Sequence, residues 1–567
     1  MAIITYSTAS IVTTLRREMN MEIKDVIASM PIEMKVGQLF LLAYPGKDPS
    51  KIAPLIEKFG ICGCYISQDN AETFEEATKT SETLQEMASR TIHKLPMILG
   101  VDQEGAWGVL APQSVTGPGN LALGANMDTK TVVRDMYRVF GEEMLSVGYN
   151  TLLAPCADVN TDPRSPIIGT RSFGQNPLHV AELVHLAVEG ARKTGILTTL
   201  KHFPGHGGTS GDTHREIPQV DKPLTALLKT DLLPFVSGID AGADIVMTSH
   251  ILYPLIDSSN PATLSRIILQ DILREQLKFS GVILSDSMNM GAIRRFYDPA
   301  DSAVMALKAG VDVVMLSEEH YDHGERYLEK QMASLERVCQ AIHSGELSQE
   351  EIDAKLCRII SLKRRMLKRD AFPPLLTMTE KMEISQRAAT SAICLVRNDF
   401  HMWPIKISGD EGIACVCLNT TPRSAYEAIT NPRGIGPNQA EPAYDALRRT
   451  LEGAGCRMKF LEMHQAKSQS KELENSKIIL LVTEDYPLPG EDMEKKEQQK
   501  LVQKCLEQYR EKCVIVGLRS PYELLEYRGS LTYLCSYSSR ICSAEAVAKL
   551  LIEERFPKGM NHITLYS

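Results

Sequence analysis

The stretch ILTTLKHFPGHGGTSGDTH, residues 196–214, joins a short apolar run to a loop rich in glycine and histidine. The run, residues 196–203, is typical of a strand that is buried on both faces of a parallel sheet. Residues 201–214 hold three histidines, four glycines and one aspartate, and their glycines and proline disfavour a helix or a strand. A buried strand that ends in titratable side chains is the repeating unit of barrels with an active site at the strand ends.

Eight runs of this kind follow one another along the first part of the chain. They are residues 35–43, 61–67, 95–102, 150–159, 196–203, 244–250, 281–287 and 311–317. Helical patterns such as residues 71–90 and 264–277 separate them. Eight parallel strands close a TIM-type (β/α)8 barrel, so we predict an α/β fold with this barrel at its amino-terminal side. The polar residues at the strand ends are Asp102, Asp158, Lys201, His202, His250 and Asp286.

The chain also predicts a second, smaller domain. Residues 1–31 read as an N-terminal extension and residues 32–370 as the catalytic barrel. Two prolines after a basic helix end predict a linker at residues 371–385. Strand-like runs at residues 391–398, 412–419, 476–485 and 513–520 then alternate with helical patterns. Residues 386–567 are therefore expected to form a C-terminal α/β sandwich domain.

Composition narrows the class of partner. The net charge of −9 over 567 residues, with no basic stripe, argues against nucleic acid. No apolar run reaches the roughly 20 residues of a membrane span. The thirteen cysteines are scattered, with CxC rather than zinc-type CxxC spacing, which predicts buried reduced thiols. The amino terminus is a poor signal peptide, and we expect a cytoplasmic protein.

Three kinds of site compete for the loop at residues 201–214. A metal site could use His202, His206 and His214, but the glycines and proline prevent the helix on which that spacing works. A phosphate loop would need a GK[ST] ending, which is missing. Asp212 and His214 stand two apart, so on extended backbone they face the same way, as a proton-transferring pair would. A solvated turn is the plain alternative for such a pair.

Asp286 is the candidate nucleophile. It comes just after the apolar residues 281–284 of the seventh run, and therefore stands at the mouth of the predicted barrel. The alternative role for an aspartate here is the N-cap of a helix.

Residues 272–289, ILREQLKFSGVILSDSMN, match the sequence around the nucleophile of glycoside hydrolase family 3 throughout. Residues 201–214 resemble the acid/base loop of its β-N-acetylglucosaminidase (β-N-acetylhexosaminidase) branch. VGQLFLLAYPG, KFGICGCYIS, VDQEG, LAPCADVNTDPRSPIIGTRSFG and MTSHILYP are similar to family segments, in family order. The resemblance covers roughly residues 32–370.

The resemblance implies a retaining glycosidase without metal or cofactor. Asp286 would attack the anomeric carbon, and His214, oriented by Asp212, would act as acid and then base. The glycines would let the loop close over the substrate. The residues that would contact the sugar are Asp102, Arg171, Lys201, His202, Trp107 and His250. Salt bridges to Asp102 or Asp158 are the plain alternative for Arg171 and Lys201, and His206 would brace the loop. His250 could equally support the contact residues from behind, and Trp107 could stack on a sugar face or simply pack.

One segment departs from the family pattern. Arginines usually follow DQEGG, whereas here Ala106, Trp107 and Leu110 follow Glu104. The change makes a basic wall apolar and aromatic, which leaves the exact β-linked amino sugar open. A β-glycoside phosphorylase or β-glucosidase of the same family, and an inactive sugar-binding protein, remain alternatives. A carbohydrate is the expected partner, and a homodimer the expected oligomer.

Overall fold

The structure is a computed structural model, and it describes eleven stretches of the chain. They are residues 22–105, 114–165, 167–209, 217–317, 326–367, 374–407, 415–421, 441–466, 468, 470–485 and 495–565.

Eight parallel strands form a barrel in the order β7-β6-β5-β4-β3-β2-β1-β8. A parallel bridge between Leu284 and Val313 joins β7 to the residue before β8 and nearly closes the ring. The strands are β1 (Phe40–Leu42), β2 (Gly63–Ile66), β3 (Ile98–Val101), β4 (Thr151–Leu152), β5 (Leu197–Phe203), β6 (Ile245–Thr248), β7 (Val282–Leu284) and β8 (Val314–Met315). Each lies inside one of the eight predicted runs. The predicted barrel is therefore confirmed.

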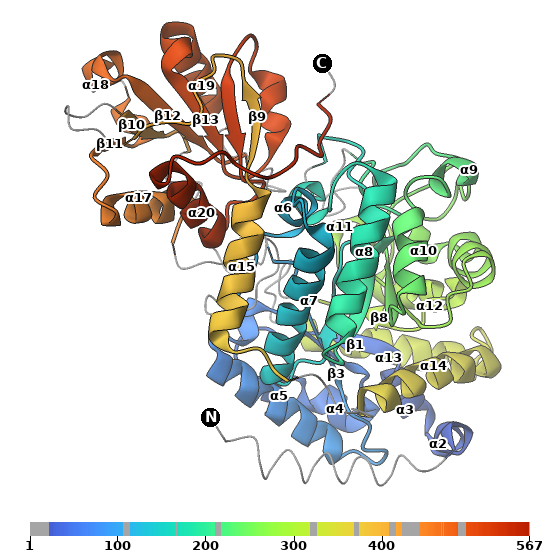
Figure 1. The fold of residues 1–567 in the computed structure, drawn as a ribbon. Coiled ribbons are helices and arrows are strands. Elements are labelled where there is room, and N and C mark those ends of the chain that lie inside the picture. Colours follow the sequence, from blue (N-terminus) through green and yellow to red (C-terminus); the bar gives the residue numbers. More distant parts are fainter. Residues whose placement is uncertain are drawn as a thin grey trace.

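Helices surround the barrel and bury its outer face (Figure 1). They are α2 (Ile23–Ser29), α3 (Ile32–Gly37), α4 (Ala53–Phe59), α5 (Phe74–Ser89), α6 (Asn120–Gly124), α7 (Thr129–Ser146), α8 (Pro177–Arg192), α9 (Leu224–Leu227), α10 (Leu233–Asp240), the π-helix η5 (Ile267–Gln276), α11 (Gly291–Arg294), α12 (Pro299–Ala309), α13 (Tyr327–His343) and α14 (Gln349–Leu367). Because both faces of the sheet are covered, every strand residue is buried, which explains the unbroken apolar runs in the sequence.

The stretch that reads as an N-terminal extension contributes to the barrel. Helix α2 packs against α14, with Val26 and Ile27 buried in the barrel core. Among the described residues, no helix combines the length and the apolar character that a membrane crossing requires.

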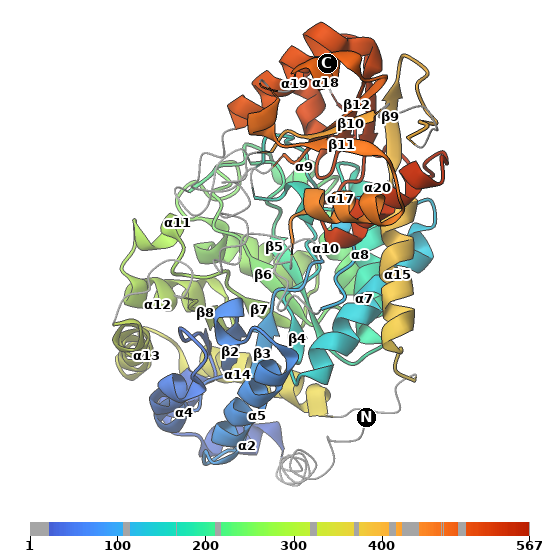
Figure 2. The same cartoon turned by 90° about the vertical axis from the view of Figure 1, so that its left-hand side faces the viewer.

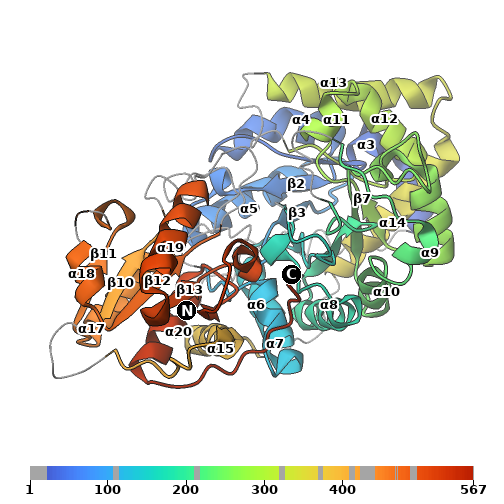
Figure 3. The same ribbon diagram turned by 90° about the horizontal axis from the view of Figure 1, so that it is seen from above.

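The second domain contains a six-stranded sheet in the order β11-β10-β12-β13-β14-β9, beside the barrel when seen from above (Figure 3). Its strands are β9 (Cys394–Asn398), β10 (Cys415–Asn419), β11 (Met458–Leu461), β12 (Ile478–Thr483), β13 (Cys513–Gly517) and β14 (Thr532–Cys535). Its helices are α17 (Ala443–Gly453), α18 (Ser470–Asn475), α19 (Lys495–Tyr509) and α20 (Ile541–Ile552). Apolar clusters cover both faces of the sheet, as expected for the predicted sandwich.

Helix α15 (Met378–Ala392) connects the two domains, and it packs against α7 of the barrel and α20 of the second domain. Part of the predicted linker at residues 371–385 is thus helical. The second domain sits at the end of the barrel where strands β3 and β4 finish (Figure 2). Arg540 contacts Thr116 there, and Tyr522 contacts Asn160. The exact domain boundaries stay a prediction.

All thirteen cysteines are free thiols, and ten of them are buried. The CxC pairs lie at the start of strands β2 and β10, and both thiols of each pair pack into the same apolar cluster as small apolar side chains.

Candidate active site

The polar residues that end strands β3, β4, β5 and β7 meet at one mouth of the barrel. They come from separate parts of the chain, yet parallel strands bring all their carboxyl ends to the same side. Strand β5 supplies two of them in succession, Lys201 and His202. Its register with β6 shifts between Leu200 and Phe203, which breaks the usual alternation of side chains. Both polar side chains therefore reach the mouth.

Lys201 lies at the centre of an ion-pair network. Its Nζ is 2.5 Å from Asp102 Oδ1 and 2.6 Å from Glu104 Oε1, and its side chain is only 2% exposed. Tyr65, in strand β2, donates its hydroxyl to Asp102 Oδ2 at 3.0 Å. Asp102 keeps 22% of its side chain exposed, so its carboxylate remains within reach of a ligand.

Arg171 completes the network from the far side of Glu104. Its Nε and Nη2 donate to the two carboxylate oxygens of Glu104 at 3.0 and 2.9 Å. Asn120 donates to the backbone carbonyl of Arg171 at 2.7 Å and holds that segment in place. This bidentate geometry is the stronger of the arrangements that an arginine–carboxylate pair adopts.

The four charges of the network balance. Burial alone would favour the neutral carboxyl groups, but the neighbouring cations outweigh it and lower the pKa of both Asp102 and Glu104. The two carboxylates consequently stay anionic beside the cationic Lys201 and Arg171. The network presents acceptors and donors side by side, as a ligand with many hydroxyl groups requires.

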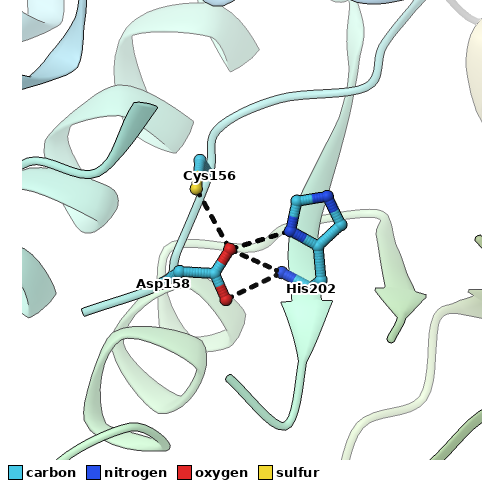
Figure 4. Close-up of side chains that lie close together, drawn as sticks. All are labelled: Cys156, Asp158 and His202. Carbon is cyan, nitrogen blue, oxygen red and sulfur yellow. Dashed lines mark hydrogen bonds and ion pairs between the residues drawn. The ribbon is translucent and has the colours of Figure 1, made fainter. Parts of the chain in front are cut away.

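His202 is held by Asp158, which follows β4 (Figure 4). The Nδ1–H of the imidazole donates to Asp158 Oδ2 at 2.8 Å, and the backbone N–H of His202 donates to the same carboxylate at 3.2 Å. Burial and the charge of Arg171 lower the pKa of His202 to about 3. The ring is therefore neutral near pH 7, and its Nε2 lone pair is directed toward Arg171, 3.5 Å away.

Cys156, Asp158 and His202 place three metal-ligand atoms within 4.8 Å of one another. The Asp158 carboxylate, however, already accepts bonds from the thiol of Cys156, from both N–H groups of His202 and from the backbone of His206. Burial and the charge of Asp158 raise the pKa of the Cys156 thiol well above its usual value, which disfavours the thiolate a metal needs. Hydrogen bonding therefore accounts for this cluster, and the donor set does not suit a metal.

Asp286 stands at the end of β7, half-buried, on the other side of this group. Its backbone N–H donates to Thr248 Oγ1 at 3.4 Å, and its Oδ1 accepts the N–H of Ser287 at 2.8 Å. Thr248 pairs with Phe203 in the sheet, next to His202. The charge of Asp286 also acts on His202, where it partly opposes the fall in the imidazole pKa.

His250, which follows β6, has hydrogen-bond partners at both ring nitrogens. Its two ring nitrogens lie 2.9 Å from Thr263 Oγ1 and 2.9 Å from the carbonyl of Ser287, and the side chain is fully buried. Both ring nitrogens therefore have partners, and we infer that His250 holds the backbone after Asp286 in place. Of the two roles that the sequence left open for His250, these bonds favour the supporting one over a direct contact with substrate.

The remaining predicted residues divide into two groups. Asp212, His214 and Trp107 lie outside the described residues. Asp102, Arg171, Lys201, His202 and Asp286 come together at the mouth. Glu104 and Tyr65 belong to the same group and were missed by sequence reasoning. Glu104 stands two residues after Asp102, so the DQE motif at the end of a strand was the available signal.

Residues 31–362 match the family described as "Glycosyl hydrolase family 3 N terminal domain". This range holds all eight barrel strands and every site residue above. The chain belongs to glycosyl hydrolase family 3. The resemblance noted in the sequence is confirmed, as is the assignment to an enzyme family.

Two curated relatives align with different lengths of this chain. Beta-hexosaminidase A of Pseudoalteromonas piscicida is 30% identical over 375 residues, which are 62% of this chain and 62% of that protein. The chain thus aligns with less than two thirds of that relative. Beta-hexosaminidase of Idiomarina loihiensis is 35% identical over 241 residues, 41% of this chain and 72% of the relative.

A family 3 structure covers both domains. The glycoside hydrolase family 3 beta-N-acetylglucosaminidase from Paenibacillus sp. is 26% identical, with a TM-score of 0.80. The match covers 94% of this chain and 98% of that one. The smaller domain beyond the barrel is therefore shared with that family 3 protein.

Proposed function

We propose that this family 3 protein is a retaining β-N-acetylhexosaminidase that removes terminal β-linked N-acetylhexosamine. Three similar proteins, two curated relatives and one solved structure, carry a hexosaminidase or N-acetylglucosaminidase name. The observation that carries the proposal is the meeting of Asp286 with His202, Lys201 and the Asp102 carboxylate at one mouth of the barrel.

Asp286 is the proposed nucleophile. A retaining glycosidase needs a carboxylate that can reach the anomeric carbon and form a covalent glycosyl-enzyme. Asp286 is half-buried at the strand end, and its Oδ1 is fixed by the N–H of Ser287, which orients the carboxylate. Attack on C1 forms the ester bond as the bond to the leaving oxygen breaks, and water later cleaves the ester.

His214 and Asp212 are the proposed acid and base. His214 would protonate the departing oxygen, then take a proton from the attacking water, while Asp212 holds the imidazole in position. The described chain reaches Thr209 on one side and Ile217 on the other side of this pair. His206 anchors the near side, since its backbone N–H donates to Asp158 at 2.6 Å.

The sugar hydroxyls are the proposed partners of the ion-pair network. Asp102 offers an exposed carboxylate acceptor, and Lys201 and Arg171 offer charged donors. His202, neutral and held by Asp158, lies beside Arg171, and its ring forms part of the wall of the proposed sugar site. Asp286 adds a negative charge beside the proposed position of the sugar ring. A negative charge there stabilises the positive charge that develops on the sugar in the transition state.

A panel of p-nitrophenyl glycosides of N-acetylglucosamine, N-acetylgalactosamine, glucose and xylose tests the proposal, with and without phosphate. We expect turnover of the two N-acetylhexosaminides and free sugar as product. Glycosyl phosphate as product would show a phosphorylase instead, and preference for the glucoside would show a β-glucosidase.

A covalent trap tests the nucleophile separately. A fluorinated N-acetylhexosaminide should add its glycosyl mass to the intact protein, on the peptide that contains Asp286. The Asp286→Asn variant should take up no label and should lose turnover. A folded protein that neither cleaves any glycoside of the panel nor forms an adduct would be a sugar-binding protein.

A further inference from the structure

A second cavity lies at the opposite end of the barrel. It is bounded by the residues before β6, by those before β7 and by one face of α14, and its volume is about 410 Å³. These are the amino-terminal ends of the strands, whereas the site described above stands at their carboxyl ends. The cavity is therefore separate from the site of the proposed glycosidase chemistry.

Four cationic side chains line this cavity: Arg192, Lys278, Arg358 and Arg365. None of the fourteen residues that line it is acidic. The chain as a whole carries a net charge of −9, so this is a local reversal of sign. Like charges gathered in one concave place repel one another unless an anion joins them.

Two buried carboxylates behind the cavity hold the arginines in place. Asp244 Oδ1 is 3.0 Å from Arg365 Nη2 and 3.5 Å from Arg192 Nη1, so two guanidinium groups share one carboxylate. Asp312 likewise pairs with Arg358 at 2.7 Å and with Arg274 at 2.5 Å. The side chains of Asp244 and Asp312 are 5% and 0% exposed. Each carboxylate thus faces two cations, which leaves an excess of positive charge.

Lys278 adds a charge that no carboxylate balances. Within the described parts of the chain, it makes no ion pair, and its side chain is exposed at the rim. Its backbone has φ +56°, a left-handed conformation that projects it from the end of η5. Among the cavity's four cations, Arg274 and the two buried carboxylates, cations outnumber anions by five to two.

The cavity also has an apolar floor, formed by Ile239, Phe279, Val282 and Leu362. A volume of about 410 Å³ is of the size that holds one small organic molecule. Guanidinium groups offer paired N–H donors that match phosphate oxygens, and an exposed ammonium adds a point charge. A doubly charged phosphate neutralises this excess of positive charge better than a carboxylate, which carries a single charge.

We propose that this cavity binds a small phosphate-bearing molecule. Its phosphate lies among Arg192, Lys278, Arg358 and Arg365, and any organic part rests on the apolar floor. The proposal concerns binding alone and does not depend on which glycoside the other end of the barrel cleaves.

Isothermal titration at constant ionic strength tests it, with inorganic phosphate and glucose 6-phosphate as the two probes. The variants are Lys278→Asn, Arg365→Gln and the double variant. Asparagine tolerates the left-handed backbone at position 278. When Arg365 is replaced, the Asp244 carboxylate still has an ion-pair partner in Arg192. Lys94→Asn is the matched control, because Lys94 also has a left-handed backbone, φ +45°, and lies outside the cavity.

We expect the wild type and Lys94→Asn to bind phosphate equally, and the double variant to bind it about tenfold more weakly or worse. Tighter binding of glucose 6-phosphate would identify an organic phosphate, and equal binding would identify free phosphate. The titration is repeated with saturating N-acetylglucosamine, which should leave binding unchanged. Binding of neither probe, equal binding by the double variant, or loss of binding with N-acetylglucosamine would each overturn the proposal.

Discussion

His202 shows how far surroundings alter a single side chain. The imidazole donates from Nδ1 to Asp158 and lies beside the guanidinium of Arg171. Both burial and that positive charge oppose a second proton on the ring, so its pKa falls to about 3. A neutral ring with a fixed tautomer keeps its one acceptor, Nε2, directed toward the guanidinium of Arg171.

The lowered pKa of His202 predicts a pH dependence of stability. Between about pH 3 and 6.5 the unfolded chain binds a proton at this residue and the folded chain does not, so stability falls as the pH drops through that window. Each pH unit inside the window contributes about 1.4 kcal/mol. His202→Gln cannot titrate and should flatten this slope.

Urea unfolding at several values between pH 4.5 and 6.5 measures the slope. His206→Gln is the companion variant, since burial and His202 lower the pKa of His206 to about 4. The His206→Gln variant should remove a second, similar contribution to the pH dependence of stability. Parallel pH curves for the wild type and His202→Gln would contradict the assignment of a neutral ring.

His214 carries a prediction about leaving groups. If it protonates the departing oxygen, His214→Ala should slow substrates with alcohol leaving groups by about 100-fold or more, within the usual contribution of a general acid. Activated aryl glycosides, whose leaving groups need little protonation, should lose much less in the glycosylation step. Pre-steady-state kinetics on a matched pair of substrates measures this. Equal losses for both would show that another group is the acid.

Sequence alone located the polar residues that end apolar runs, as with Asp102, Lys201 and Asp286, and their functional roles stay a prediction. It missed Glu104: the DQE motif places this residue near the strand end, but the motif does not reveal that its carboxylate bridges two cations. The cations Arg171 and Lys201 lie 67 and 97 positions further along the chain than Glu104. Only the closed barrel brings these three together.

At the level of elements, strands β2 and β3 pack unusually closely at Gly63. A Cβ atom on Gly63 would lie 1.9 Å from the carbonyl oxygen of Ile98, in the backbone of the neighbouring strand. Backbone atoms of paired strands cannot move apart without loss of their hydrogen bonds. The glycine between Cys62 and Cys64 is therefore required by the packing of the barrel wall.

Gly63→Ala should destabilise the barrel by about 3 kcal/mol or more, as overpacking and broken strand pairing act together. Gly100→Ala in β3 is the matched control, because a Cβ there would meet only the side chain of Leu153, at 3.4 Å. Thermal unfolding of both variants measures the difference. A smaller loss for Gly63→Ala than for Gly100→Ala would contradict this packing.

The structure contains two strands that the sequence did not predict, β11 and β14. Both have four residues, and β11 stands at the edge of its sheet with three of its four residues only partly buried. A short edge strand such as β11 lacks the long apolar run of a central one. Strand β14 lies inside the sheet and is fully buried, but its four residues are too few for a distinct apolar run. The four predicted strands of this domain, β9, β10, β12 and β13, were confirmed.

For the molecule as a whole, the contact between the domains reaches toward the candidate site. Arg540, at the start of α20, is buried and donates to Thr116 Oγ1 from Nε and Nη2 at 3.1 and 2.8 Å. Thr116 begins the segment that leads to Asn120, which in turn holds the carbonyl of Arg171. The second domain therefore supports the loop behind the ion-pair network of the candidate site.

Arg540→Ala should lower the free energy of unfolding by about 1–3 kcal/mol, the range for a lost charged hydrogen bond. If the loop positions Arg171, KM should rise more than kcat falls. Arg540→Lys keeps one charged donor group at this position, so its KM should lie between that of the wild type and that of Arg540→Ala. Steady-state kinetics on the best p-nitrophenyl substrate distinguishes this from simple loss of stability, which would lower the active fraction and leave KM unchanged.

The expected homodimer stays a prediction, as does the cytoplasmic location. Sedimentation of the full chain at several concentrations would establish the oligomeric state.

The sequence by itself determined the barrel, the α/β character of the second domain and the family, because strands buried on both faces leave continuous apolar runs and family motifs are local in the chain. The tertiary structure decided which charges neutralise one another, that His202 stays neutral, and that His250 supports backbone rather than sugar. Those properties depend on burial and on distances between residues far apart in sequence, and both arise only when the barrel closes.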